Sequence, residues 1–217
     1  METNLVDILK GYVTPDVISK ASTMLNESES GVYKGVSAAI PTLLIGLVYK
    51  SNDSSTMQSV MNLINDTSVH SGDVLSNLPS LLAGYENTTA LNTGSKLMAL
   101  LFKNKQSDTS EVIARTSSIR ESSAASLLGM AAPLVLSYFA KSGMTLNSLK
   151  SLLSSQKENI LSAAPSGLNF GVGSTIHNDS RGKIHDVRKA ETSSAKWLIP
   201  LLLVGVGLFA LFFFIIT

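Results

Sequence analysis

The sequence predicts an all-α protein, an internally duplicated multi-helix bundle followed by one C-terminal transmembrane helix. Residues 197–216 carry no charged side chain, and as a helix they would span about 30 Å, the thickness of a bilayer's hydrocarbon core. Upstream of this run, apolar residues recur at helical spacing between N-cap and glycine signals. The order of those segments then begins again near residue 96, which indicates an internal duplication.

The composition narrows the classes of function. The chain has 217 residues, with 17 Lys and Arg against 16 Asp and Glu, and no cysteine. The balanced charge argues against nucleic acid as a partner, because no net positive field attracts phosphates. Without cysteine there are no disulfides and no thiolate metal sites. No stretch has the spacing of a catalytic, cofactor-binding or metal-binding motif, so we expect no such site.

The first copy of the bundle begins with two short helices. The apolar cluster Leu5–Leu9 is followed by Gly11, and glycine is a frequent residue at helix ends. Thr14 then precedes Pro15, the pattern of an N-cap followed by proline at the first helical position. Two further amphipathic runs follow later in this copy, at residues 57–64 and 74–79.

Each copy contains one long helix with two distinctive features. Near its start, an asparagine or serine is followed three residues later by glutamate, which predicts a capping box. In its middle lies a proline, which predicts a kink because it removes one helical hydrogen bond. The predicted caps are Asn26 with Glu29 and Ser118 with Glu121, and the predicted kinks are Pro41 and Pro133.

The duplication predicts copies at about residues 4–82 and 96–168, packed together as one bundle over residues 1–168. The matched segments include Asp16–Ser22 with Glu111–Ser117, in which an acid, a Val-Ile pair, a base and a serine align. The other matched segments fall in the same order along both copies. Two copies are too few for a solenoid, so we expect two similar sets of helices in one bundle.

The long helices are apolar on nearly every side at residues 36–49 and 127–140. A helix of this composition lies either in a protein core or in a membrane. Each run is about 14 residues long, which is short for a membrane span and favours the core. The alternative is a pore-forming protein that inserts these two helices as a hairpin.

The remainder of the chain predicts a linker and a membrane anchor. Residues 169–195 combine glycine with scattered charge, as flexible linkers do. Residues 196–217 form the anchor, with Trp197, Pro200, Phe209, Phe212, Phe213 and Phe214 as its characteristic residues. Basic residues precede the anchor and none follows it, so the positive-inside rule places the N-terminal domain in the cytoplasm. We expect either a tail anchor or an internal helix of a longer envelope protein.

Two groups of residues have side chains that can bind metal ions or take part in catalysis. His70, His177 and His185 lack the spacing of metal ligands, so we expect ordinary solvent-exposed histidines. Glu29 and Glu121 recur at matched positions. They are the carboxylate pair that a catalytic function of this chain would use. Their capping role already accounts for both of them, so an enzyme is the less favoured hypothesis.

Two stretches, Leu25–Glu29 and Gly35–Leu44, resemble the bacterial YidB-like family of helical domains, whose function is not established. The resemblance covers the chain from Leu5 to Pro165. In some members of that family, the helical domain leads to one transmembrane helix and then to a peptidoglycan-binding OmpA-like domain. The resemblance implies a bacterial envelope protein and carries over no catalytic residue.

The sequence therefore predicts a non-catalytic binding or assembly module, held by a single span in the bacterial inner membrane. The expected partners are the lipid bilayer and an unidentified protein that binds between the two halves of the bundle. Self-association into a homo-oligomer is left open.

Overall fold

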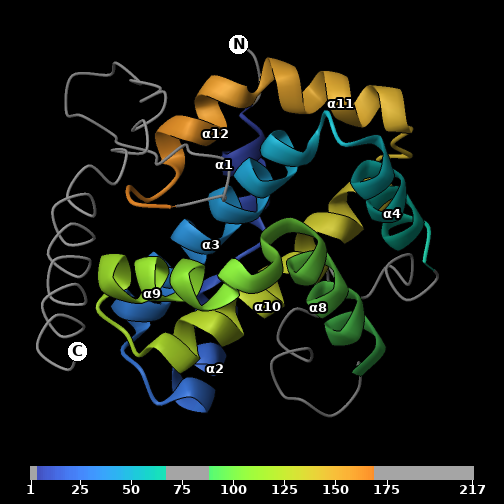
Figure 1. Ribbon diagram of the computed structural model, residues 1–217. Helices are drawn as coiled ribbons and strands as arrows, with labels where there is room; N and C mark the ends of the chain where they lie inside the picture. Colours follow the sequence, from blue (N-terminus) through green and yellow to red (C-terminus); the bar gives the residue numbers. More distant parts are fainter. Residues whose placement is uncertain (1–3, 67–87, 169–217) are drawn as a thin grey trace, which may run out of the picture. The chain divides into compact units, whose positions relative to one another are not determined.

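The computed structural model describes residues 4–66 and 88–168, and these residues form α-helices and one short 3-10 helix, with no strand (Figure 1). The prediction of an all-α fold is confirmed for this part of the chain. All described residues belong to one structural unit, residues 1–186. The predicted linker and anchor, with Trp197, Pro200, Phe209, Phe212, Phe213 and Phe214, lie outside the described residues, as does the amphipathic run at 74–79.

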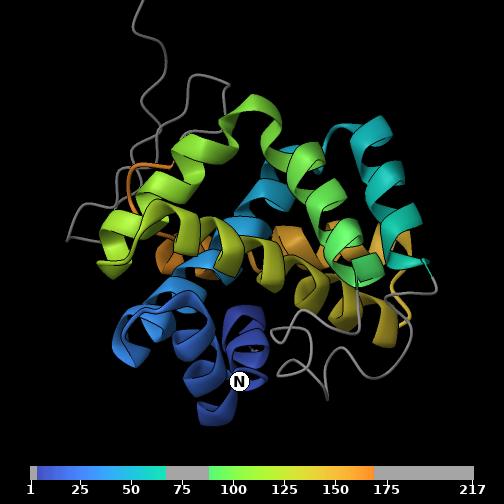
Figure 2. The ribbon, with the colours of Figure 1, turned by 90° about the horizontal axis from the view of Figure 1, so that it is seen from below.

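The helices fall into two runs along the chain. The first run comprises α1 (Leu5–Gly11), α2 (Pro15–Leu25), α3 (Glu29–Lys50) and α4 (Ser54–Ile64). The second comprises α8 (Thr88–Phe102), the 3-10 helix η1 (Lys103–Lys105), α9 (Gln106–Ser117), α10 (Glu121–Lys141), α11 (Leu146–Ser155) and α12 (Lys157–Ala163). Helices α3 and α10 pack against each other, with α8 and α9 against α10 and with α11 and α12 against α3 (Figures 1 and 2).

The two central helices form the hydrophobic core. Their most apolar stretches are 72% buried in α3 and 67% buried in α10, as expected for core helices. The apolar runs of about 14 residues lie within helices of 22 and 21 residues, so among the described residues two helices are long and apolar enough to cross a membrane. Length therefore does not separate a core helix from a span here. Buried core helices pass the same test, so burial rather than length now favours the core.

The helix signals near the N-terminus are confirmed. Helix α1 ends at Gly11, and α2 begins at Pro15. The Thr14 hydroxyl accepts a hydrogen bond from the backbone N–H of Val17 at 3.4 Å. The N-cap and the proline at the first helical position therefore act as their sequence pattern predicts.

The two predicted capping boxes are wrong. Asn26 (φ 50°) and Ser118 (φ 57°) adopt the left-handed conformation and end the preceding helices α2 and α9. Glu29 and Glu121 are the first residues of α3 and α10 rather than the third. Asparagine serves helix ends as well as helix starts, so the spacing alone did not separate the two roles.

The true N-caps lie closer to the helices. The Ser28 hydroxyl accepts the N–H of Gly31 at 3.0 Å and caps α3. In α10 the N-cap position is held by Arg120, whose side chain forms no capping bond. The glutamates still occupy the first helical turn, where a negative charge is favourable to the helix dipole.

Both prolines lie buried within continuous helices. The kinks at Pro41 and Pro133 stay predictions. What the structure adds is a close helix crossing at Pro133. A Cβ atom on Gly94 of α8 would lie 2.8 Å from Pro133 Cδ and 2.9 Å from the carbonyl oxygen of Gly129. Proline leaves the carbonyl four residues earlier without its helical partner, and α8 approaches the helix at this point.

One matched pair of segments does not occupy equivalent positions. Val17 and Ile18 lie in the first turn of α2, whereas Val112 and Ile113 lie in the second half of α9. Counted from the first residue of each helix, the Val-Ile pair of α9 lies about one helical turn later than the Val-Ile pair of α2. A shift of one turn preserves the buried face of a helix, so the sequence pattern did not reveal it.

A buried glutamine ties the ends of the domain together. Gln156 lies between α11 and α12 and is 5% exposed. Its Oε1 atom accepts the backbone N–H of Leu5 at 3.1 Å and the Asn159 side-chain amide at 3.2 Å. This side chain satisfies an N–H at the start of α1 that the helix itself leaves unpaired.

Candidate functional site

An apolar groove lies between α2, α3 and α10. Its cavity volume is about 20 Å³, which is room for about one water molecule. The lining residues are Val13, Val17, Ala21, Val36, Leu127, Met130, Ala131 and Leu134. Val13 lies in the connection before α2, Val17 and Ala21 in α2 and Val36 in α3, and the last four belong to α10. The groove thus lies where the sequence analysis expected a partner surface, between the two halves of the bundle.

The groove exists because α2 covers less of the core than α9 does. Helix α9 packs against both α3 and α10, and its Ile113 is fully buried. Helix α2 packs against α3. The small side chains of Ala21 and Ala131 face the space left between α2 and α10. Val36 and Met130 at the groove are only partly buried, so apolar surface is open to a ligand.

Two large apolar side chains are exposed on the same helices. Met24 near the end of α2 is 46% exposed, and Tyr33 in α3 is 58% exposed. Met24 follows Val17 by seven residues, a spacing that places both on one face of α2. Met24 therefore continues the apolar face of α2 beyond the groove.

A cluster of polar contacts joins the two halves next to α2. We call it the clasp, and it consists of Glu27, Arg120 and Ser123. Glu27 Oε1 accepts three hydrogen bonds: from the backbone N–H of Arg120 at 3.0 Å, from Arg120 Nε at 2.9 Å and from the Ser123 hydroxyl at 2.8 Å. Arg120 Nη2 also donates to the carbonyl oxygens of Leu25 and Asn26.

The electrostatics of the clasp favour the ionised carboxylate. The pKa of Glu27 is lowered from 4.5 to about 2, chiefly by the hydrogen bond from the Arg120 side chain, then by those from the Arg120 backbone and the Ser123 hydroxyl. The Glu27 side chain is 12% exposed, whereas that of Arg120 is 58% exposed. The carboxylate also lies at the N-terminus of α10, where the helix dipole favours negative charge. Glu27 therefore caps α10 from the other half of the bundle.

The α9–α10 connection makes a second contact with the first half, through Ile119. A Cβ atom on Gly31 would lie 2.7 Å from Ile119 Cγ2, and one on Gly35 would lie 3.0 Å from Ile119 Cδ1. The isoleucine thus occupies the space that two glycines leave on α3. The α2–α3 connection thus contacts α10 through Glu27, and the α9–α10 connection contacts α3 through Ile119.

A second hollow is polar and open. It is lined by Ser51, Asn52, Lys150, Ser151, Ser154 and Ser155. Two of its hydroxyls are used within their own helical ends, because Ser51 donates to the carbonyl of Val48 at 2.8 Å and Ser155 to that of Leu152 at 3.0 Å. These groups are not arranged to converge on one ligand, so we assign no site here.

The carboxylate pair considered for catalysis lies at the starts of α3 and α10. Glu29 and Glu121 are both exposed at helix starts, and Glu121 accepts a hydrogen bond from the Ser107 hydroxyl at 2.7 Å. Within residues 4–66 and 88–168, no group of three His, Cys, Asp or Glu side chains is placed to hold a metal ion. His70, His177 and His185 lie outside the described residues.

Sequence reasoning missed the clasp altogether. Glu27 and Arg120 are 93 residues apart, and each looks like an ordinary charged residue in a polar connection. Glu27 does lie within the stretch Leu25–Glu29 that carries the family resemblance, but that stretch does not point to its partner.

The fold defines a class: an all-α domain built around two apolar helices, with a small apolar groove on one side. The chain belongs to a family described as bacterial protein of unknown function (DUF937), whose match covers residues 7–142. This agrees with the resemblance to YidB-like helical domains. The match extends from α1 through α10, so it includes the groove and the clasp. No curated protein and no solved structure matches the chain significantly.

Proposed function

We propose that this protein is a non-catalytic binding or assembly module of the bacterial envelope, tethered to the inner membrane by its C-terminal helix. The observation that carries the proposal is the apolar groove between α2, α3 and α10. A small hollow lined by aliphatic side chains suits the tip of one apolar side chain, which an amphipathic helix of a partner could supply. Met130 is suited to such contacts because methionine side chains adapt to the shape of their partner.

The sequence supports the tether. Residues 197–216 are uncharged, and the preceding basic residues favour a cytoplasmic position for the domain. Tethering raises the local concentration of the domain near partners in the same membrane. Such a module promotes assembly without a catalytic step. If the chain without residues 197–217 still sediments with membranes, the tether is refuted.

We further propose that the domain arose by duplication, as the sequence pattern suggested. Three features support this proposal. Helices α3 and α10 both begin with glutamate and carry a proline at the same position from their first residue. The helix before each of them ends in a left-handed residue, Asn26 or Ser118. These matched positions are separated by the same number of residues.

Site-specific photo-crosslinking tests the binding function. A photoreactive phenylalanine analogue at Val36, at the groove, should capture a defined protein partner in native membranes. Met130→Glu places a charge at the groove and should abolish that crosslink. Ser126→Glu, an exposed position one turn away on the same helix, is the matched control and should leave the crosslink intact. Equal crosslinking in both variants would mean that the groove is not the binding site.

The pore-forming alternative has one observation in its favour: α3 and α10 are long and apolar enough to cross a membrane. Against it stands their burial, because insertion would first have to take the core apart. A dye-leakage assay with liposomes separates the two functions. A pore-former without residues 197–217 releases the dye, and a binding module does not.

A further inference from the structure

We propose that the two halves of the domain, residues 4–66 and 88–168, pair as the two subunits of a twofold-symmetric dimer do. Unlike residues at equivalent positions make each half select the other half of its own chain rather than the same half of a second copy. The inference rests on the proposed duplication and does not depend on the groove. It adds that the surface between the halves is an interaction surface with a selected partner.

The packing of the helices is the first argument. A twofold axis sets an element at the axis against its own equivalent, and every other contact between the halves then occurs twice. Helix α3 packs against its equivalent α10, and α4 packs against its equivalent α11. The contact of α4 with α10 recurs as that of α11 with α3, and the contact of α1 with α10 recurs as that of α8 with α3. The exception is α9, which packs on α3, whereas the groove lies between α2 and α10.

The buried residues repeat at one constant separation along the chain, which is the second argument. The equivalent pairs are Leu5 with Leu97, Leu9 with Leu101, Val17 with Thr109, Ala21 with Ile113, Met57 with Leu149 and Met61 with Leu153. Every residue in these pairs is buried. The equivalence therefore extends over three pairs of helices, including α2 and α9, whose Val-Ile pairs are out of register.

Two contacts between the halves are related by the same equivalence. Ile119 is equivalent to Glu27, and Gly31 is equivalent to Ser123. A Cβ atom on Gly31 would lie 2.7 Å from Ile119 Cγ2, and Glu27 accepts the hydroxyl of Ser123 at 2.8 Å. In a symmetric dimer, each contact of one residue with another is accompanied by the reciprocal contact. These two contacts form such a reciprocal pair, although the residues that make them differ.

At the centre of the interface, two equivalent residues meet each other. Gly35 of α3 is equivalent to Leu127 of α10. A Cβ atom on Gly35 would lie 2.5 Å from Leu127 Cδ1, and Leu127 is buried. A residue that contacts its own equivalent lies at the twofold axis. The leucine of one half thus fills the space that the glycine of the other half leaves.

This pair of residues disfavours the pairing of like halves. Two first halves would set Gly35 against Gly35 and leave a cavity in the core. Two second halves would set Leu127 against Leu127 and overfill the same space. Only the pairing of a first half with a second half fits one leucine to one glycine.

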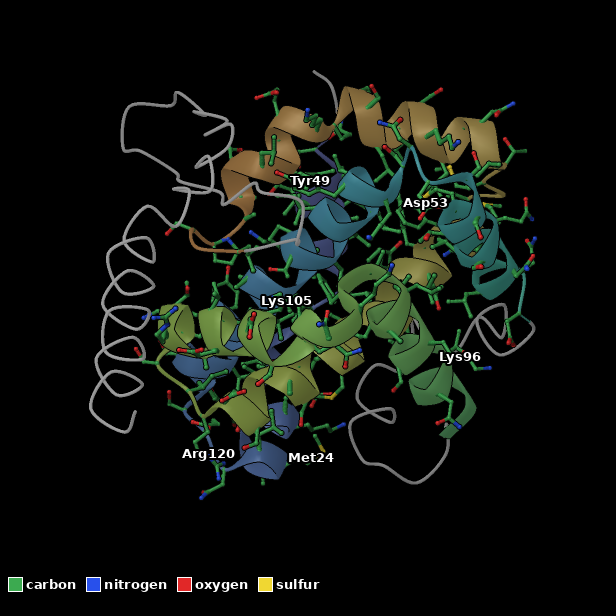
Figure 3. All side chains as sticks on the ribbon, in the orientation of Figure 1. Met24, Tyr49, Asp53, Lys96, Lys105 and Arg120 are labelled. Atoms are coloured by element: carbon green, nitrogen blue, oxygen red, sulfur yellow. The ribbon has the colours of Figure 1, made fainter. Side chains whose placement is uncertain are left out.

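The clasp selects in the same direction. Figure 3 shows Arg120 beside Met24, near the end of α2, where its guanidinium reaches Glu27 and the carbonyl of Leu25. The residue equivalent to Arg120 in the first half is Ser28. In a pair of two first halves, the largely buried Glu27 carboxylate would therefore lack its guanidinium partner, which is unfavourable. Specificity comes from such unfavourable contacts in the wrong pair as well as from favourable contacts in the right one.

The selection matters for a tethered protein. Copies held in one membrane meet at high local concentration. Because the two halves of each copy have similar helices, pairing between copies would compete with pairing within a chain. The unlike residues at the interface keep each domain paired within its own chain.

A double-mutant cycle on the full-length protein in detergent tests the contact at the axis. Gly35→Ala should lower Tm in the wild-type background, because the added methyl group meets Leu127. In the Leu127→Ala background, the same change should raise Tm by about 2–4 °C, since only the gain in helix propensity remains. Gly129→Ala is the matched control and should raise Tm in both backgrounds, because a Cβ atom there meets nothing within 4 Å. Equal shifts for Gly35→Ala in both backgrounds would overturn the reciprocal contact.

A single cysteine at the axis tests the choice of partner. The chain has no cysteine, so Gly35→Cys introduces one thiol. In a pair of two first halves, the two thiols would face each other and form a disulfide on oxidation. Native membranes oxidised with copper phenanthroline should contain no disulfide-linked dimer, whereas the same chains oxidised in urea should crosslink. A disulfide-linked dimer in the native membranes would overturn the selection against like halves.

Neither measurement involves the groove. Their failure therefore leaves the proposed binding function standing. Conversely, a groove that captures no partner at Val36 refutes the binding function and leaves the pairing of the halves untouched.

Discussion

Replacing Gly94 by alanine should destabilise the protein, although alanine is the better helix former. Gly94 lies within α8, where the exchange by itself gains about 1 kcal/mol of helix propensity. The added methyl group would lie 2.8 Å from the Pro133 ring and 2.9 Å from a backbone carbonyl oxygen. Neither neighbour is the free end of a flexible side chain, so the helices must shift. Overpacking of this kind costs about 1–3 kcal/mol.

Gly129 in α10 provides a matched control, because a Cβ atom there would meet nothing within 4 Å. Gly129→Ala should therefore show the propensity gain alone. The helix propensity term cancels between the two variants, so Gly94→Ala should be less stable than Gly129→Ala by about 1–3 kcal/mol. For a chain of this size, each kcal/mol corresponds to about 2–4 °C in Tm.

Far-UV circular dichroism on the full chain in detergent, with heat and with urea, measures the difference. The helix content before melting should be the same in both variants. If Gly94→Ala proves as stable as Gly129→Ala, the close crossing of α8 over Pro133 is not present in solution.

Three further predictions concern single side chains. Because the pKa of Glu27 is about 2 in the folded protein and near 4.5 when unfolded, its ionisation stabilises the fold above pH 4.5, and this contribution disappears as the pH falls toward 2. Glu27→Gln should therefore flatten the loss of Tm over that range, and parallel pH profiles would contradict the role of the clasp. Gln156→Leu leaves the buried N–H of Leu5 unpaired and should cost about 1–3 kcal/mol in urea unfolding. Ser28→Ala should cost about 1 kcal/mol through loss of the α3 cap, whereas Ser30→Ala, at an exposed position in the same turn, should cost less.

Local signals in the sequence predicted local structure well where one residue type has one role. Proline at the first helical position and threonine before it located the start of α2, because the N-cap bond forms within a few residues. The same reasoning failed at Asn26 and Ser118. Both residues suit two kinds of helix boundary, and the choice depends on where the next helix packs.

The apolar composition of residues 36–49 and 127–140 identified the two central helices. It did not identify the groove, because an apolar side chain in a groove has the same sequence pattern as one in a core. Val36 and Leu127 became groove residues only because α2 lies over α3 and leaves part of α10 uncovered.

The sequence by itself thus determined the helical class, the two apolar helices and the family, since these follow from periodicity and composition along the chain. Only the tertiary structure decided that Glu27 caps α10, that Ile119 fills the space at two glycines and that Gly94 lies against Pro133. Each of these contacts joins residues far apart in sequence. Their energies arise from the packing of one helix on another, and no local pattern encodes which partner that packing will bring.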